Sequence, residues 1–236
     1  MKKYALLFFI SFFLFLIGNL PANLLDSSVR QLNVNIATLE GSIWQGRTQH
    51  SKLGVIKWDF LPLALLQAKL SWRMDIEQEV QHRLVFDIGV NIFKQLQLRD
   101  IAGTLSSTTL KMLALLPDNI ANATSFVVQI NELNASWDTD DLGIRPNELQ
   151  GLLQVKNLNI LGEHLGDYQL HIDSENQQLN GVITEQDAQI KVQLKATLSP
   201  ANLLNIQGDI NTSNQNIRTL LDGIGIKDKV VFDYQL

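Results

Sequence analysis

The sequence contains no cysteine, which excludes a disulfide scaffold and every site built on a thiolate. Charged residues occupy only 18% of the 236 positions, and asparagine and glutamine supply much of the remaining polarity. The net charge is −5, so the chain lacks the dense basic face with which proteins bind nucleic acid, and we expect no nucleic-acid partner. A chain of this length can bury a core as one domain or as two small ones.

Motifs of catalysis and of metal binding are also missing. The chain has no Gly-x-Ser-x-Gly elbow, no phosphate-binding loop ending in Gly-Lys-Ser/Thr and no His-Glu-x-x-His. Glu163-His164 lacks a second histidine at helical spacing. The acidic run at 138–141 lacks the glycine and glutamate of a calcium loop. We therefore predict no catalytic residue, no cofactor and no metal ligand, and interpret the chain as a protein that is not an enzyme.

The N-terminal segment is almost wholly apolar. Lys2 and Lys3 precede a run from Tyr4 to Ile17 that only Ser11 interrupts. A run without a polar face is typical of a signal peptide or of a membrane anchor. By the positive-inside rule, the two lysines would stay in the cytoplasm.

The cleavage chemistry favours an anchor over a removable signal. A cut after Ala22 would place Leu20 at the third position before the cut, where a small residue is needed. Counted through Leu25, the segment reaches the roughly 17–25 residues that span a bilayer. We predict a single-pass transmembrane helix over residues 1–25 that contacts membrane lipid, with residues 26–236 outside the cytoplasm. A cleaved signal peptide is the alternative.

The remainder of the chain alternates apolar and polar residues. The longest run carries apolar side chains at every second position from Leu84 to Ile92, and similar runs recur from residue 32 to the last residue. Strict alternation is typical of half-buried strands, and antiparallel sheets tolerate one solvated face. The sequence thus predicts a mainly β fold, a mostly antiparallel, twisted meander.

Helical signals are few and short. Helical spacing before a proline predicts a helix over 107–116, and a second short helix is expected over 216–221. Pro62 at a first helical position predicts a single turn over 62–67. Loop residues at 138–146 suggest a boundary between two halves, about 26–140 and 147–236.

One cluster of residues stands out as a candidate site. Gly41 and Gly46 flank Trp44, a pattern that suggests a bulge or tight turn aiming the indole inward. Trp58 follows on the next expected strand, which Pro62 ends. We interpret the five residues as a hydrophobic corner, because tryptophan usually serves as core. Docking of a partner on the same pair of indoles is the alternative.

These residues carry a family resemblance. A short N-terminal anchor, a strand, Gly-Ser-Ile-Trp-x-Gly over 41–46, and then Trp58, Pro62 and the leucine pair at 65–66 resemble the type II secretion system protein N family. Gly-Thr-Leu at 103–105 and Leu-Gln-Gly at 149–151 are also similar to that family.

The resemblance implies an accessory inner-membrane component of the apparatus that moves folded periplasmic proteins across the outer membrane of a Gram-negative bacterium. It implies that the bulk of the chain is periplasmic and that its partners are other inner-membrane platform or secretin components of that apparatus. It supplies no catalytic residues. Exposed sheet edges and the anchor would be the parts that dock.

A second interpretation concerns lipids. Long meanders with one apolar face, rooted in the inner membrane, also occur in AsmA-like envelope proteins. If the apolar face formed an open groove, it would hold a lipid or another hydrophobic ligand. The two interpretations differ in how that face is covered: a sheet packed on itself or on the 107–116 helix favours docking, and an open groove favours lipid handling.

Overall fold

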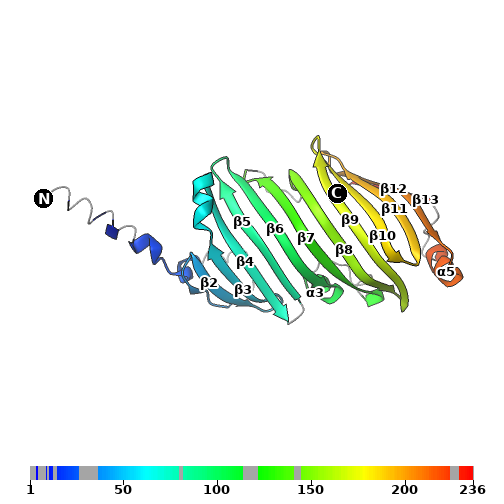
Figure 1. Ribbon diagram of the computed structural model, residues 1–236, viewed down its shortest axis with the longest axis horizontal. Helices are drawn as coiled ribbons and strands as arrows, with labels where there is room; N and C mark the ends of the chain where they lie inside the picture. The colour runs from blue at the N-terminus through cyan, green and yellow to red at the C-terminus, as the bar shows by residue number, and fades with distance from the viewer. Residues whose placement is uncertain are drawn as a thin grey trace.

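The computed structural model describes residues 4, 9, 11–12, 15–26, 37–79, 82–113, 122–140, 145–223 and 229–235. In these ranges the chain forms one antiparallel sheet of 13 strands, in which each strand pairs with the next along the chain (Figure 1). The predicted antiparallel meander is confirmed. The strands are β1 (Glu40–Gly41), β2 (Gln45–His50), β3 (Gly54–Phe60), β4 (Lys69–Glu79), β5 (His82–Asn91), β6 (Gln95–Ser106), β7 (Thr124–Asp138), β8 (Glu148–Ile160), β9 (Glu163–Glu175), β10 (Gln178–Ala188), β11 (Ile190–Leu198), β12 (Leu203–Thr212) and β13 (Lys229–Gln235).

Among the described residues, short helices with defined bounds accompany the sheet: η1 (Ala22–Leu25), η2 (Pro62–Gln67), α3 (Ser107–Met112) and α5 (Gln215–Gly223). Pro62 opens η2, and Ala68 ends it in the left-handed region at φ 53°. The Ser106 hydroxyl caps α3 by accepting from the Thr109 amide at 3.1 Å. The predicted helices are present, although residues 114–116 of the first lie outside the described residues.

The sheet is continuous across the middle of the chain. The expected boundary at 138–146 falls in the connection between β7 and β8, and these two strands pair over most of their length. A single row of directly opposite residues runs from Phe60 through Trp72, Ile88, Leu98 and Ala135 to Leu149. One apolar face therefore extends without a break over both proposed halves.

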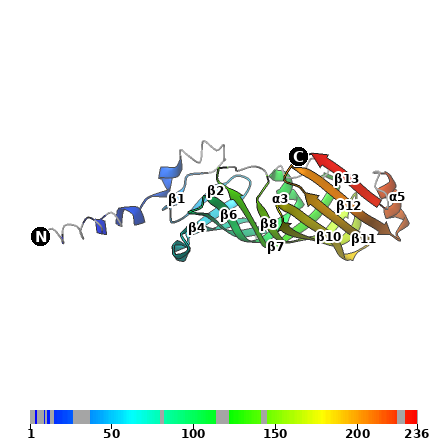
Figure 2. The ribbon, with the colours of Figure 1, turned by 90° about the horizontal axis from the view of Figure 1, so that it is seen from above.

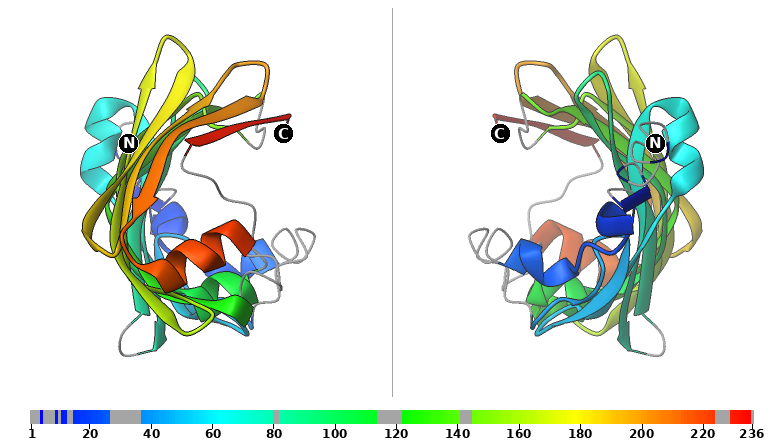
Figure 3. Two further views of the ribbon diagram at one scale, coloured as in Figure 1. Left: turned by 90° about the vertical axis from the view of Figure 1, so that its right-hand side faces the viewer. Right: turned by 90° about the vertical axis from the view of Figure 1, so that its left-hand side faces the viewer.

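The sheet bends into an arch, seen along its long axis in Figure 3. Register shifts interrupt the pairing on three successive strands, at Asp100, Glu132 and Asn157, each with φ near 53°. Such bulges bend a strand and increase its twist. Helices α3 and α5 lie inside the arch, whereas η2 lies on its outer side (Figures 2 and 3).

The bulge at Asn157 is held by a carboxylate of the neighbouring strand. Asp167 accepts from the Asn157 amide at 2.8 Å and from the Lys156 ammonium at 3.0 Å. The Asn157 amide is the largest cause that lowers the pKa of Asp167 below its usual value, ahead of the Lys156 ammonium and His164. The unpaired donor that a bulge creates is thus satisfied by a charged acceptor.

The most deeply buried core lies beneath α5. Ile217 is fully buried against Leu165, Tyr168, Ile190 and Val192 of the sheet. The whole chain exposes 15463 Å², against about 10,700 Å² for a compact monomer of 26.5 kDa. The bent single layer and the N-terminal segment, which extends away from the sheet in Figure 1, both contribute to this excess.

The N-terminal segment is only partly described. Residues 15–18 are helical, but among the described residues no helix is both long and apolar enough to cross a bilayer. The transmembrane helix over 1–25 therefore stays a prediction. The strand expected around residues 32–36 lies outside the described residues.

The buried position of Ile217 predicts a large loss of stability on truncation. We expect Ile217→Ala to lower the free energy of unfolding by about 2–4 kcal/mol, because it leaves a cavity between α5 and the sheet. Leu161→Ala, in the exposed turn after β8, should change it by less than about 0.5 kcal/mol. Urea unfolding followed by circular dichroism measures both, and equal effects would contradict this description of the core.

Tyr168 predicts a loss of stability in alkali. Burial is the main cause that raises its pKa to about 12, and the Glu185 carboxylate adds to the effect. The folded state thus prefers the neutral phenol, so about 2–3 kcal/mol is present below pH 10 and is lost between pH 10 and 12. Unfolding of Tyr168→Phe should depend less steeply on pH in this window; an unchanged slope would refute the assignment.

Candidate functional site

Three indoles converge on the turn between β1 and β2. The Trp58 N–H donates to the Ser42 carbonyl at 3.0 Å, and the Trp72 N–H donates to the Ile43 carbonyl at 3.0 Å. The Trp44 N–H instead donates to the Ile17 carbonyl at 2.7 Å. A buried indole needs one hydrogen-bond acceptor for its N–H. The turn carbonyls provide this acceptor, and the indole N–H in turn replaces the water that the packed rings exclude from these carbonyls.

The aromatic rings pack in a continuous series. The Phe60 ring lies 4.8 Å from Trp44 at an interplanar angle of 65°, and 5.5 Å from Trp72 at 58°. These are the edge-to-face and tilted geometries that the ring quadrupoles favour. The Phe60 amide also donates to the Trp44 carbonyl at 2.6 Å, which fixes the turn to the end of β3.

Two glycines make room for this packing. Gly41 has φ +98°, in the left-handed region that favours glycine. A Cβ on Gly46 would overlap the Trp58 ring and the Glu40 carbonyl. We call the set Gly41, Trp44, Gly46, Trp58, Phe60 and Trp72 the tryptophan corner.

The tryptophan corner holds the chain that precedes the sheet. Besides the bond from Trp44, the Ile43 amide donates to the Leu20 carbonyl at 3.0 Å, and Pro21 forms a bridge with Ser42. We call residues 17–22 the N-terminal strap. It lies in direct contact with the turn between β1 and β2.

Four of the five candidate residues from the sequence lie together in the corner: Gly41, Trp44, Gly46 and Trp58. Pro62 lies two residues beyond Phe60 and opens η2. Sequence reasoning missed Trp72 and Ile17. The alternation of β4 already marked Trp72 as apolar, but only the register that sets it opposite Phe60 identifies it as part of the corner.

The reverse face of the first strands is polar and carries ion pairs. Arg73 binds Asp87 of β5 at 2.8 and 3.0 Å, and Arg83 binds Asp75 of β4 at 2.9 and 2.6 Å. The Arg83 guanidinium lowers the pKa of Asp75. These partly exposed pairs contribute little stability but favour the observed register.

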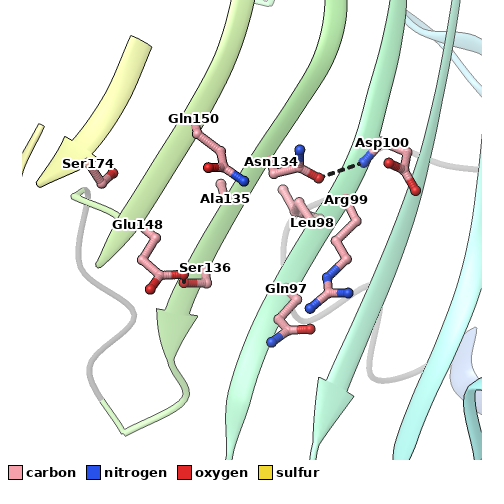
Figure 4. Close-up of a pocket in the computed structure, with 10 residues that line it drawn as sticks. All are labelled: Gln97, Leu98, Arg99, Asp100, Asn134, Ala135, Ser136, Glu148, Gln150 and Ser174. Atoms are coloured by element: carbon pink, nitrogen blue, oxygen red, sulfur yellow. Dashed lines mark hydrogen bonds between the residues drawn. The ribbon is translucent and has the colours of Figure 1, made fainter. Parts of the chain in front are cut away.

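A hollow of about 480 Å³ lies on the sheet surface over β6 to β9. Figure 4 shows its polar side chains spread over these strands, with the Asp100 amide donating to the Asn134 side-chain oxygen at 3.0 Å. Neither histidine nor lysine lines it. In the described ranges, no group of three or more acidic residues or histidines is placed to hold a metal ion. The hollow therefore fits a solvated surface at a bulge.

The glycine packing gives a direct test of the corner. Gly46→Ala should lower the free energy of unfolding by about 1–3 kcal/mol, because its methyl group displaces the Trp58 ring. Gly18→Ala is the matched control: a Cβ there meets no atom within 4 Å, so we expect no loss. Thermal unfolding and near-ultraviolet circular dichroism of the indoles measure the effect. An unperturbed indole signal in Gly46→Ala would contradict the described packing.

Comparison with known proteins identifies the family. Residues 32–230 match the family model described as type II secretion system (T2SS), protein N. The match includes the candidate residues from Gly41 to Pro62 and 12 of the strands, β1 to β12, in full. Neither curated proteins nor solved structures give a match. The family match covers most of the chain, which therefore belongs to the type II secretion system protein N family.

Proposed function

We propose that this protein is an accessory inner-membrane component of the type II secretion apparatus, which supports export of folded periplasmic proteins by docking on other components. Family membership supports a role in type II secretion. The single-pass anchor over residues 1–25 and the periplasmic placement of the sheet belong to the proposal. The observation that supports docking is that one edge of the sheet is short and covered, whereas the other is long and has no described strand beside it.

The edge at β1 is short and covered. β1 has two residues, and the bridge between Pro21 and Ser42 places the N-terminal strap beside it. The tryptophan corner braces this edge from one face. Little backbone is left there for a partner strand to pair with.

The edge at β13 is long, apolar and open. β13 has seven residues and pairs with β12; no other described strand lies against it. Val231 is 74% exposed, and the Phe232 and Tyr234 rings stack at 6.2 Å on the other face. Unpaired backbone donors and acceptors beside apolar side chains favour the addition of a strand from another chain.

The two edges lie at opposite ends of the molecule. Figure 1 shows the N-terminal segment at one end of the arch and β13 toward the other. An anchor at residues 1–25 would thus leave β13 far from the point of attachment. We propose that β13 is the site where a platform or secretin component adds a strand.

A second candidate function is lipid handling by an AsmA-like apolar face. The large exposed surface and the bent single layer favour it. Of the described helices, α3 contacts β6 and β7, and α5 packs over β9, β11 and β12, so their cover is local. Under this alternative, phospholipid would lie along the inner face of the arch.

A matched pair of valines tests the docking proposal. Val231 and Val182 belong to the same row of opposite residues, Val182–Lys195–Gln207–Val231, but Val182 lies on an inner strand. We expect a photoreactive residue at 231, in the native membrane, to give adducts with a secretion component, and one at 182 to give none. Val231→Lys should reduce complex formation about tenfold or more, because an unpaired charge at the edge opposes strand addition, whereas Val182→Lys should not.

The outcomes separate the two candidate functions. Equal adducts at both positions, or unchanged complex formation in Val231→Lys, would contradict docking at β13. Adducts with phospholipid alone, joined by lipid that co-purifies with the chain, would favour the lipid-handling alternative.

A further inference from the structure

Five large apolar side chains stand exposed at one end of the strands. They lie on η2 and on the turn between β5 and β6, and their exposed fractions lie between 52% and 84%. We call this set the leucine platform: Leu63, Leu65, Leu66, Ile92 and Phe93. Scattered single exposures are ordinary, but a contiguous apolar surface marks a place of contact.

The two parts of the leucine platform are joined by the sheet. The Ile92 amide donates to the Ala68 carbonyl at 3.2 Å, which brings the β5–β6 turn against the end of η2. The opposite pair Leu70 and Val90 is also exposed, but it shares the face of Trp72 and Ile88 and therefore does not belong to the platform. The exposed side chains of η2 and of the β5–β6 turn are therefore neighbours.

The backbone at both ends of η2 fixes this helix against the outer side of the sheet. Pro62 sets the entry into η2, and the left-handed Ala68 turns the chain back into β4. The Leu61 amide donates to the Ser71 carbonyl at 2.9 Å and fixes η2 to the sheet. η2 lies on the opposite side of the sheet from α3 and α5 (Figure 3), and its leucines Leu63, Leu65 and Leu66 are exposed.

The leucine platform lies at the same end of the molecule as the N-terminal segment. Figure 1 places η2 and the N-terminal segment at the same end of the molecule. The strand β3 joins the tryptophan corner directly to η2. The described aromatic residues Phe9, Phe12 and Phe15 are exposed as well.

The short apolar run has a consequence for the folded part. As a helix, the run from Tyr4 to Ile17 would span about 21 Å, less than the ~30 Å hydrocarbon core of a bilayer. A short span draws its flanking residues into the interface. Trp44 binds the carbonyl of Ile17 itself, and tryptophan is enriched at membrane interfaces.

We propose that the leucine platform inserts into the surface of the phospholipid bilayer that holds the N-terminal segment. The inference rests on the membrane anchor of the proposed function and adds a second contact to it. The N-terminal strap, at the end of the proposed anchor segment, is bonded directly to the sheet, so η2 is held near the headgroups. Insertion buries apolar side chains that the fold leaves in water. It also fixes the tilt of the arch relative to the membrane.

The absence of cysteine makes this inference directly testable. Single variants Leu66→Cys and Phe93→Cys carry an environment-sensitive fluorophore in the full chain. Leu161→Cys is the matched control. Leu161 is 66% exposed, in the turn between β8 and β9, which lies at the opposite end of the strands from the leucine platform. Each labelled chain is reconstituted in vesicles of phosphatidylethanolamine and phosphatidylglycerol.

We expect emission from positions 66 and 93 to shift to shorter wavelength and to lose intensity with spin-labelled lipid. Position 161 should keep the emission of a probe in water. Replacement of Leu63, Leu65 and Leu66 by serine should abolish the quenching at position 93. The near-ultraviolet signal of the indoles reports whether these variants keep the fold.

Flotation of the same vesicles separates the two hypotheses. If the chain floats but positions 66 and 93 behave like water-exposed probes, the inserted platform is refuted and the anchor stands. If the chain does not float, the anchor of the proposed function and this inference both fail. Equal quenching at position 161 would indicate adsorption of the whole surface and would refute the inference. Shielding of 66 and 93 in native membranes alone would indicate a protein partner and would also refute it.

Discussion

Backbone pairing within a single open sheet is the constraint on which the rest of the structure depends. Eleven inner strands, β2 to β12, have neighbours on both sides, so unpaired edges remain at β1 and β13 in the described sheet. The fold treats them in opposite ways: tryptophan and glycine packing close the region around β1, and β13 stays long and apolar. A protein that needed both ends protected would not leave Val231 and Phe232 exposed at one of them. This asymmetry is the strongest physical argument for a protein that extends from a fixed point to a partner.

A single layer also has to protect its apolar face without a second sheet. Bulges at Asp100, Glu132 and Asn157 bend the strands, so the apolar row from Phe60 to Leu149 lies on one face of a curved surface. Short helices then cover parts of it, most completely where Ile217 enters the cluster around Tyr168. Curvature replaces a second layer, and it leaves more surface in water than a compact monomer would. Because a single curved layer leaves both a sheet edge and part of an apolar face accessible, docking and lipid handling are both physically reasonable for this fold.

Much of this architecture could be predicted from the sequence, because a solvated face imposes a period of two. The run from Leu84 to Ile92 predicted β5, and its repetition predicted an antiparallel meander. Gly41, Gly46 and Trp44 could be identified because two glycines that flank a tryptophan indicate a backbone turning closely around a large ring. The bulges could not be predicted, since Asp100, Glu132 and Asn157 are ordinary residues in a left-handed conformation that only the neighbouring strands require. Trp72 could not be assigned to the corner, nor Ile17 to its contact with Trp44, because these hydrogen bonds join residues 29 and 27 positions apart.

The leucines of η2 show how far such reasoning extends. The sequence marked the pair at 65–66 through family resemblance alone, and apolar residues in a proline turn would ordinarily be assigned to a core. The structure places them on the outer side of the arch, where no described element covers them. β3 connects the tryptophan corner directly to the leucine platform. A contact that holds the tryptophan corner in place therefore also determines where the leucine platform lies. Because Trp44 binds the Ile17 carbonyl inside the proposed anchor segment, an anchor in the membrane would orient the whole sheet through Trp44, and the free edge at β13 would point in a direction set by the membrane.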